Sequence, residues 1–332
     1  MVLLEMALST YDRVSFPLIK CLSLTTLYRD FYPVLNKQTQ LMKNALPKTL
    51  STLPYQGFLR GSAWLYALGT LLPLWWLVVT AFQPEGVNIE QFPLNLGWFQ
   101  GKPSLATWQA LWDTPALGMS FLYTVIVTIT TATCNVLSSL LLAFMLERKS
   151  LKQYTALVQP CILAATSIPF QVLLIPLYLE MNTLGLTDTP QSPLPALLGL
   201  ILPFAFSGFG VFYIRAALKT CPIALEEAAM LEGASTGFIL WRIVVPQLQP
   251  TLISLFTMSS IATWGDFLWP NVVLLEPEHL TLPIFLARLQ QTLGDQWRLL
   301  AAGALLSTLP SLGLFLALQT FMTPTQQGSA LK

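Results

Sequence analysis

The chain has 332 residues, of which 54% are apolar and only 10% are charged, and its formal net charge is +1. Soluble domains carry roughly a quarter charged residues, so this composition excludes an ordinary soluble protein, a disordered chain and a nucleic-acid-binding protein that neutralises phosphates. It indicates a polytopic helical membrane protein.

The charged residues are spaced so that six stretches of more than 20 residues contain no Asp, Glu, Lys or Arg. A transmembrane helix needs about 20 apolar residues, so each stretch is long enough to cross a bilayer. The predicted spans are about residues 61–84, 118–146, 155–180, 192–214, 249–275 and 299–322. We therefore expect an all-α membrane protein with six transmembrane helices in a domain that covers residues 61–332.

Residues 1–60 precede the first predicted span and mix charged residues with short apolar patches such as Phe16–Ile19. This pattern is too broken for the apolar core of a signal peptide. Two interpretations are open: a cytoplasmic segment with an interfacial amphipathic helix, or a start codon placed too early, with Met42 as the true start.

Lysine and arginine are distributed unevenly between the two sides of the predicted spans. Fourteen of the 17 lie before the first span, in the 2–3 and 4–5 loops and at the C-terminal end, and three lie in the other loops. Cytoplasmic loops carry the excess of basic residues. We therefore expect both termini and the 2–3 and 4–5 loops to be cytoplasmic.

The third and fourth predicted spans are rich in proline and glycine. Proline removes a helical hydrogen bond and kinks a transmembrane helix, whereas glycine lets neighbouring helices approach closely. The prolines are Pro160, Pro169 and Pro176 in the third span and Pro193, Pro195 and Pro203 in the fourth, which also contains Gly208 and Gly210. We expect irregular helices here, which occur both in moving proteins and in static bundles.

The predicted 5–6 loop, about residues 276–298, contains the apolar stretch Leu280–Ala287. An apolar stretch outside the membrane indicates that something packs on it. Three interpretations are open: contact with another chain, contact with the bilayer surface, or packing within the chain itself.

The predicted 4–5 loop carries strong helix signals. Residues 222–232 are nearly all good helix formers, with Pro222 suited to the first helical position. Gly233 stands where a left-handed C-terminal cap is needed, and Ser235 suits the N-cap of a second helix that ends before Pro246. The loop is therefore expected to form a cytoplasmic helix–turn–helix, too short and polar to span the membrane.

Glu227 has the apolar neighbours Ile223, Met230 and Leu231 at helical spacings on the first of these helices. An acid surrounded by apolar side chains describes a docking surface with one charged contact. The alternative is a surface helix that only connects two spans.

The sequence indicates no catalytic, cofactor or metal site. Residues 233–237 fit the G-x-S-x-G string of hydrolases, but a helix precedes them, and the single histidine, His279, is expected across the membrane. Gly101-Lys102 lacks the remaining residues of a phosphate-binding loop. One histidine and four scattered cysteines, with no C-x-x-C pair, do not make a metal site.

The 4–5 loop resembles a known motif. Glu227-Ala228-Ala229, Gly233 and Ile243-Val-Val-Pro246 match in spacing the EAA loop of the permeases of binding-protein-dependent ABC importers, with Val245 in place of the usual Leu. The resemblance covers about residues 60–332, and the maltose-type subunit is the nearest relative by pattern.

A second segment resembles the sugar-transporting members of that family. Trp264-Gly-Asp266-Phe-Leu-Trp269-Pro270 is similar to their W-N-D-F-L-W-P segment, with Gly265 replacing Asn. Asp266 is the one ionised residue well inside a predicted span, so we interpret it as a candidate for the solute path together with Trp264 and Trp269. The alternative is a structural acid, satisfied by backbone groups beside a break at Pro270.

The resemblance implies a sugar-importing permease of the bacterial inner membrane, without cofactor or nucleic acid. Two permease subunits, usually different ones in maltose-type systems, would form the membrane path between lipids. Two ATPase subunits would dock on the EAA helix, where Glu227 pairs with a basic residue, and ATP-driven closure would open the path outward. An extracytoplasmic binding protein would deliver the solute, and we expect Leu280–Ala287 to contact it.

Two other functions are open. An ion-coupled secondary transporter favours paired ionisable residues across internal repeats, and the sequence shows neither. A permease of the same family for a non-sugar solute, such as glycerol phosphate, has the same motifs. The sequence does not name the sugar.

Overall fold

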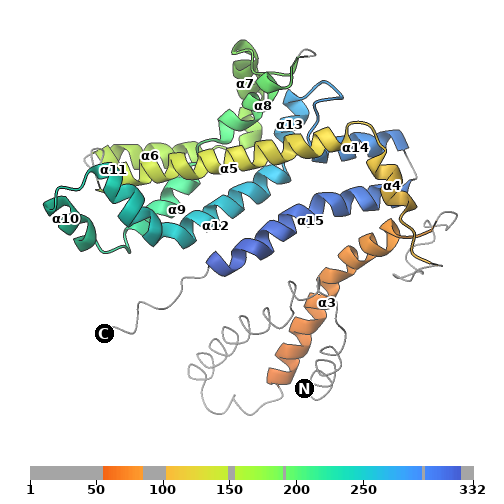
Figure 1. The fold of residues 1–332 in the computed structure, drawn as a ribbon, viewed down its shortest axis with the longest axis horizontal. Helices are drawn as coiled ribbons and strands as arrows, with labels where there is room; N and C mark the ends of the chain where they lie inside the picture. Colours follow the sequence, from red (N-terminus) through yellow and green to blue (C-terminus); the bar gives the residue numbers. More distant parts are fainter. Residues whose placement is uncertain (1–54, 85–101, 149–153, 190–191, 294–295, 323–332) are drawn as a thin grey trace. The chain divides into compact units, whose positions relative to one another are not determined.

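The computed structural model describes residues 55–84, 102–148, 154–189, 192–293 and 296–322, and every regular element in these ranges is helical (Figure 1). The chain divides into two compact units, residues 1–71 and 72–332. The described part of the first unit is the beginning of α3 (Tyr55–Ala81), where large apolar side chains such as Trp64 and Leu65 are exposed. The predicted N-terminal segment, residues 1–60, lies almost entirely outside the described residues.

Four helices are long and apolar enough to cross a membrane. They are the Gly61–Ala81 part of α3, α5 (Leu117–Arg148), the continuous helix Thr236–Trp264 and α15 (Trp297–Met322). At most 39% of the most apolar window of each is buried, which suits helices whose apolar side chains face lipid.

Two pairs of shorter helices pass the same test only together. α6 (Thr155–Thr166) and α7 (Phe170–Thr183) are bent by 97° at their junction. α8 (Leu194–Ile201), extended by η4 (Leu202–Phe204), and α9 (Gly208–Leu218) are bent by 47°. The described chain therefore has four candidate spans, or six if each bent pair is one span.

A proline lies at the first break and another shortly before the second, in the two spans where the sequence predicts irregular helices. Pro169 is the N-cap of α7 with ψ of 134°, and a proline also disfavours helical backbone at the residue before it. Pro203 lies in the short η4 before the second break. After that break Ser207 starts α9, because its Oγ accepts the backbone N–H of Gly210 at 3.2 Å.

α5 is the central helix of the unit formed by residues 72–332, and its main partners are α9 and α12 (Val245–Trp264). One apolar cluster fills the space where these three helices meet, and a second joins α5 to α8, α13 (Leu268–Val273), α14 (Leu282–Leu293) and α15. A methyl group on Gly210 of α9 would overlap the side chain of Ser139 on α5. The glycine therefore permits the close helix approach expected from the sequence.

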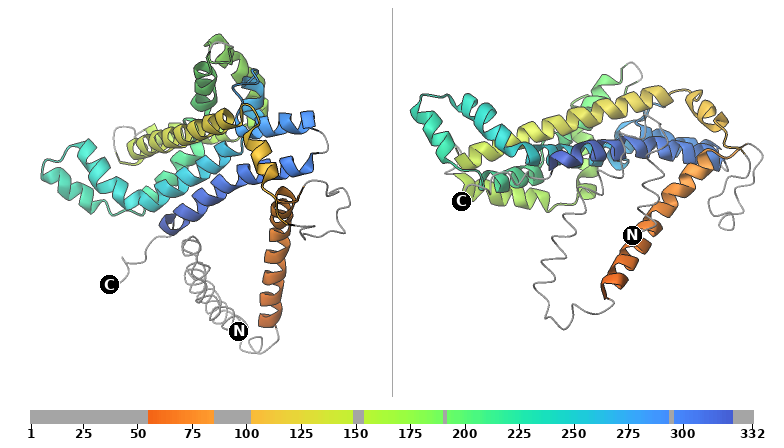
Figure 2. Two further views of the ribbon diagram at one scale, coloured as in Figure 1. Left: turned by 45° about the vertical axis from the view of Figure 1, so that its right-hand side comes forward. Right: turned by 60° about the horizontal axis from the view of Figure 1, so that its bottom comes forward.

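The two ends of α5 carry different elements. Figures 1 and 2 show α10 (Ala224–Leu231) and α11 (Thr236–Phe238) at one end, and α4 (Ala106–Trp112) and α14 at the other. The C-terminal turns of α5 and α9 both lie at the α10 end, since side chains from these turns contact one another there.

The fifth predicted span, 249–275, differs from the observed helix. The helix starts at Thr236, continues through the π-helix η5 (Ile239–Val244) into α12 and ends at Trp264. The second loop helix therefore does not stop before Pro246, contrary to expectation. Pro246 lies in the first turn of α12, and the wider π-helical turn immediately before it accommodates the missing N–H.

The apolar stretch Leu280–Ala287 packs mostly within the chain. Leu282 and Ile284 are fully buried and Phe285 is 7% exposed, because α14 packs against α5 and α15. Thr124 of α5 accepts the backbone N–H of Leu282 with its Oγ1 at 2.8 Å. Internal packing is thus the correct interpretation, and the expectation that these apolar side chains form an outer contact surface is wrong.

Candidate functional site

The helix α10 ends in a hydrogen-bonded turn centred on Gly233. Gly233 has φ of +84°, in the left-handed region that favours glycine. Its N–H donates to the carbonyl of Met230 at 3.0 Å, and the N–H of Ala234 donates to the carbonyl of Ala229 at 2.9 Å. These two bonds form a Schellman motif, so the cap expected from the sequence is confirmed.

Ser235 then starts the next helix. Its Oγ accepts the N–H of Phe238 at 3.3 Å, as expected for an N-cap. At the other end, α10 begins at Ala224 with Ile223 as its N-cap. The expectation that Pro222 occupies the first helical position is therefore wrong. The C-terminal cap at Gly233 and the N-cap at Ser235 therefore form a tight turn that leads the chain from α10 directly into the long helix that ends at Trp264.

The motif residues of this segment fall into an exposed group and a packed group. Glu227, Ala228 and Pro246 are exposed. Ala229 and Ile243 are half-buried and pack on the apolar cluster between α5, α9 and α12. Glu227 is therefore exposed to solvent, while Ala229 on the same helix packs against the rest of the chain.

Large apolar side chains are exposed on α10, next to Glu227 in the sequence, and in the turns that follow Gly233. Leu225 is 54% exposed and Leu231 90% exposed, and Ile223, Met230, Phe238 and Trp241 are exposed as well. Exposed apolar groups around one acid form a surface suited to a partner with an apolar cleft and a basic group.

Sequence reasoning missed the neighbouring acid, Glu226. Its side chain is 2% exposed and its Oε1 lies 3.2 Å from Nε of Arg148, at the C-terminal end of α5. A buried charge must be paired, so Glu226 holds α10 to α5 while Glu227 faces outward. Helical spacing from Glu227 carried no signal for this contact, because its partner lies on a distant helix.

The second candidate site is the break between α12 and α13. The chain leaves α12 at Gly265, and Oδ1 of Asp266 accepts the N–H of Leu268 at 3.2 Å. Trp264 donates its indole N–H to the carbonyl of Ser307 in α15 at 2.7 Å. Trp269 donates its indole N–H to the carbonyl of Gly199 in α8 at 3.0 Å. The break therefore lies at Gly265 and Asp266 rather than at Pro270, which is inside α13.

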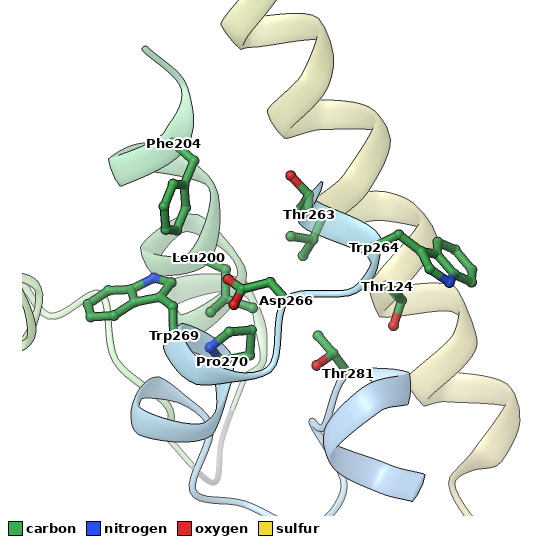
Figure 3. A pocket seen from close by; sticks show the side chains of 10 residues that line it. Thr124, Leu200, Phe204, Thr263, Trp264, Asp266, Trp269, Pro270 and Thr281 are labelled. Atoms are coloured by element: carbon green, nitrogen blue, oxygen red, sulfur yellow. The ribbon is translucent and has the colours of Figure 1, made fainter. Parts of the chain in front are cut away.

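Asp266 projects into a small hollow between these tryptophans (Figure 3). Thr124, Thr263 and Thr281 also line it, so its polar groups come from a carboxylate and three hydroxyls. The hollow measures about 10 Å³, roughly the space of one water molecule, whereas small-molecule pockets measure roughly 300–1,000 Å³. Both indoles are buried and hydrogen-bonded to backbone, so in this conformation neither ring is open to a sugar.

Within the described ranges, no three His, Cys, Asp or Glu side chains lie close enough together to hold a metal ion. The three described cysteines, Cys134, Cys161 and Cys221, are free thiols.

The sequence matches a family of known proteins over more than half its length. Residues 136–326 match the family described as the binding-protein-dependent transport system inner membrane component. The chain belongs to this family. The permease region thus includes α9, α10, both caps around Gly233 and the break at Asp266.

A curated relative agrees with this assignment. The permease is 30% identical to the lactose transport system permease protein LacG of Rhizobium radiobacter over 168 residues, which cover 51% of this chain and 59% of LacG, less than two thirds of that relative.

Two solved structures share the fold of the permease. One is a bacterial ABC transporter involved in the import of the acidic polysaccharide alginate, with a TM-score of 0.66 and 19% identity over 82% of this chain and 99% of that chain. The other is a bacterial alginate ABC transporter in complex with an alginate pentasaccharide-bound periplasmic protein, with a TM-score of 0.58 and 15% identity over 80% of this chain and 94% of that chain.

Proposed function

We propose that this permease is one membrane-spanning subunit of an ATP-driven importer for a sugar or a related solute. The observation that carries the proposal is the α10 surface, where Glu227 is exposed among apolar side chains in a chain of the binding-protein-dependent family. Docking of a separate ATPase on this surface supplies the energy that the permease cannot supply itself.

The proposed arrangement has six spans, with residues 61–332 as the transmembrane domain and both termini cytoplasmic. It fits four long helices and two bent pairs, each pair serving as one span. A second permease subunit completes the path, and an extracytoplasmic protein delivers the solute. The lactose permease LacG and the alginate transporter with its periplasmic protein support this choice of solute and partners.

Glu227→Gln tests the proposal in the assembled transporter. Loss of one partner of a desolvated charge pair typically costs about 2–5 kcal/mol, so the variant should lose the co-purifying ATPase and solute uptake together. Glu232→Gln is the matched control, because it removes an exposed acid from the end of the same helix. Wild-type ATPase binding by Glu227→Gln would contradict the proposal.

Two alternatives give different results in the same measurements. An ion-coupled secondary transporter takes up solute without any ATPase and responds to an ion gradient. A family member for a non-sugar solute such as glycerol phosphate keeps the ATPase but fails to take up any of a panel of sugars.

A further inference from the structure

Arg148 joins three elements at the α10 end of the bundle. It is the last residue of α5, and its Nε lies 3.2 Å from the Glu226 carboxylate on α10. Its Nη2 donates to two carbonyls at the end of α9, that of its last residue Leu218 at 2.8 Å and that of Cys221, just after it, at 3.1 Å. One guanidinium group therefore fixes the end of α5, the end of α9 and the start of α10 relative to one another.

The contact between Glu226 and Arg148 is a buried anchor of α10, in addition to the packing of Ala229 on the apolar cluster. Glu226 is the one buried residue of this eight-residue helix, while its neighbours Leu225 and Glu227 are exposed. The Arg148 side chain is 12% exposed. Removal of either group would leave the other charge unpaired in a site with little access to water, which is strongly destabilising.

The residue before Arg148 makes a second ion pair, in which α5 supplies the acidic partner rather than the basic one. Glu147 accepts from Arg215 of α9 through Nε at 3.2 Å and Nη2 at 2.9 Å. Arg215 also donates through Nη1 to Oε1 of Gln159 on α6 at 3.1 Å. The last turn of α5 is thus held to α9 by both Glu147 and Arg148, to α10 by Arg148, and to α6 through Arg215.

We propose that Arg148 is a positioning residue that carries displacement of α10 to α5 through Glu226, an inference that rests on the proposed docking of an ATPase at Glu227. A guanidinium group suits this role, because its Nη2 donates to two carbonyls while its charge lies beside the Glu226 carboxylate, an arrangement that a lysine ammonium does not reproduce. Movement of α10 therefore moves α5, the central helix, rather than bending the loop.

The first test compares Glu226→Gln with Glu232→Gln in the complete transporter with its own ATPase subunits and binding protein. Glu226→Gln should keep ATPase co-purification and unstimulated ATP hydrolysis. Stimulation by the binding protein should fall at least about fivefold, the lower range of typical coupling between sites. Glu226→Asp should recover part of the stimulation, which a defect in general stability would not predict.

The outcomes separate the two proposals. Full stimulation in Glu226→Gln, with ATPase binding lost in Glu227→Gln, would overturn the role of Arg148 alone. Unchanged ATPase binding in Glu227→Gln would overturn the proposed docking itself.

A second measurement leaves the ion pair intact, in case Glu226→Gln does not assemble. Spin labels replace the exposed residues Leu141 on α5 and Leu231 on α10 in a cysteine-free transporter. Their distance distribution should be the same without nucleotide and after trapping with ATP and vanadate, because the two helices move together. A shift of the distribution between the two states would overturn the proposal.

Discussion

Asp188 and His279 lie 91 residues apart in the sequence, yet Nδ1 of His279 is 2.7 Å from Oδ1 of Asp188. The other carboxylate oxygen accepts the N–H groups of Leu275 at 3.1 Å and Glu276 at 2.8 Å. The Asp188 side chain is fully buried. This one carboxylate therefore connects the segment after α7 to the segment between α13 and α14.

We predict that Asp188→Ala destabilises this connection. It leaves two backbone N–H groups and the imidazole without their acceptor, and an unsatisfied group that is shielded from water costs about 1–3 kcal/mol. Thermal unfolding of the detergent-solubilised protein should shift to lower temperature, with faster proteolysis of residues 275–281. Glu278→Ala removes an exposed acid from the same segment and should have little effect. Equal stability of the two variants would contradict the prediction.

Gly233→Ala should destabilise the turn after α10 although there is space for the added methyl group. No atom lies within 4 Å of the position of a Cβ at this residue, so the cost comes from φ of +84°, about 1–2 kcal/mol for a residue with a side chain. Gly233→Asn should be less harmful, because Asn tolerates this region better. We expect weaker ATPase co-purification for Ala than for Asn.

Gly237→Ala is the matched control for this turn. Its added Cβ also meets no atom within 4 Å, and the glycine lies in α11 without a positive φ. Alanine in a helix is favoured over glycine by roughly 0.5–1 kcal/mol, so the two substitutions should change the stability in opposite directions. The same loss in both variants would show that φ at residue 233 is not the cause.

Phe285→Ala should act on stability rather than on a surface contact. Phe285 is 7% exposed within the cluster around α5 and α15, and truncation of a buried Phe costs about 3–5 kcal/mol. The measurement is the unfolding temperature of the solubilised chain without any partner. Leu275→Ala, at a position 58% exposed, should leave it nearly unchanged. A stable Phe285→Ala variant with weakened binding-protein stimulation would restore the surface interpretation.

Asp266→Asn separates a role in the solute path from a role in the backbone. Asn keeps an oxygen that accepts the N–H of Leu268, so stability should be retained. If the carboxylate binds solute hydroxyls, its loss should weaken solute binding by about 1.5–3 kcal/mol, roughly ten- to hundredfold in the KM for uptake. Asp266→Ala removes both functions and should also lower the unfolding temperature. Unchanged uptake by Asp266→Asn would leave Asp266 with a capping role only.

Several local signals in the sequence predicted the local structure, although the expected roles of Pro222 and Pro246 at helix ends were wrong. The charge-free stretches indicate α5 and α15 to within a few residues, since length and composition alone decide whether a helix suits a bilayer. Gly233 and Ser235 are confirmed as caps because caps depend on nearest neighbours in the chain.

Features that depend on distant contacts could not be predicted in the same way. Three prolines in the third span gave equal signals, and only packing decides that the 97° bend falls at Pro169. The burial of Glu226 against Arg148, and of Phe285 beneath its neighbours, needs helices that are far apart in the sequence to be in place first.

Because of the two indole hydrogen bonds beside Asp266, the size of the hollow depends on the distance between α8 and α15. One edge of the break is attached to α15 through Trp264 and the other to α8 through Trp269. If α8 and α15 separate while both hydrogen bonds hold, Trp264 and Trp269 move apart and the hollow around the carboxylate enlarges. Reporter groups on these two helices would register that opening without altering any side chain that lines the hollow.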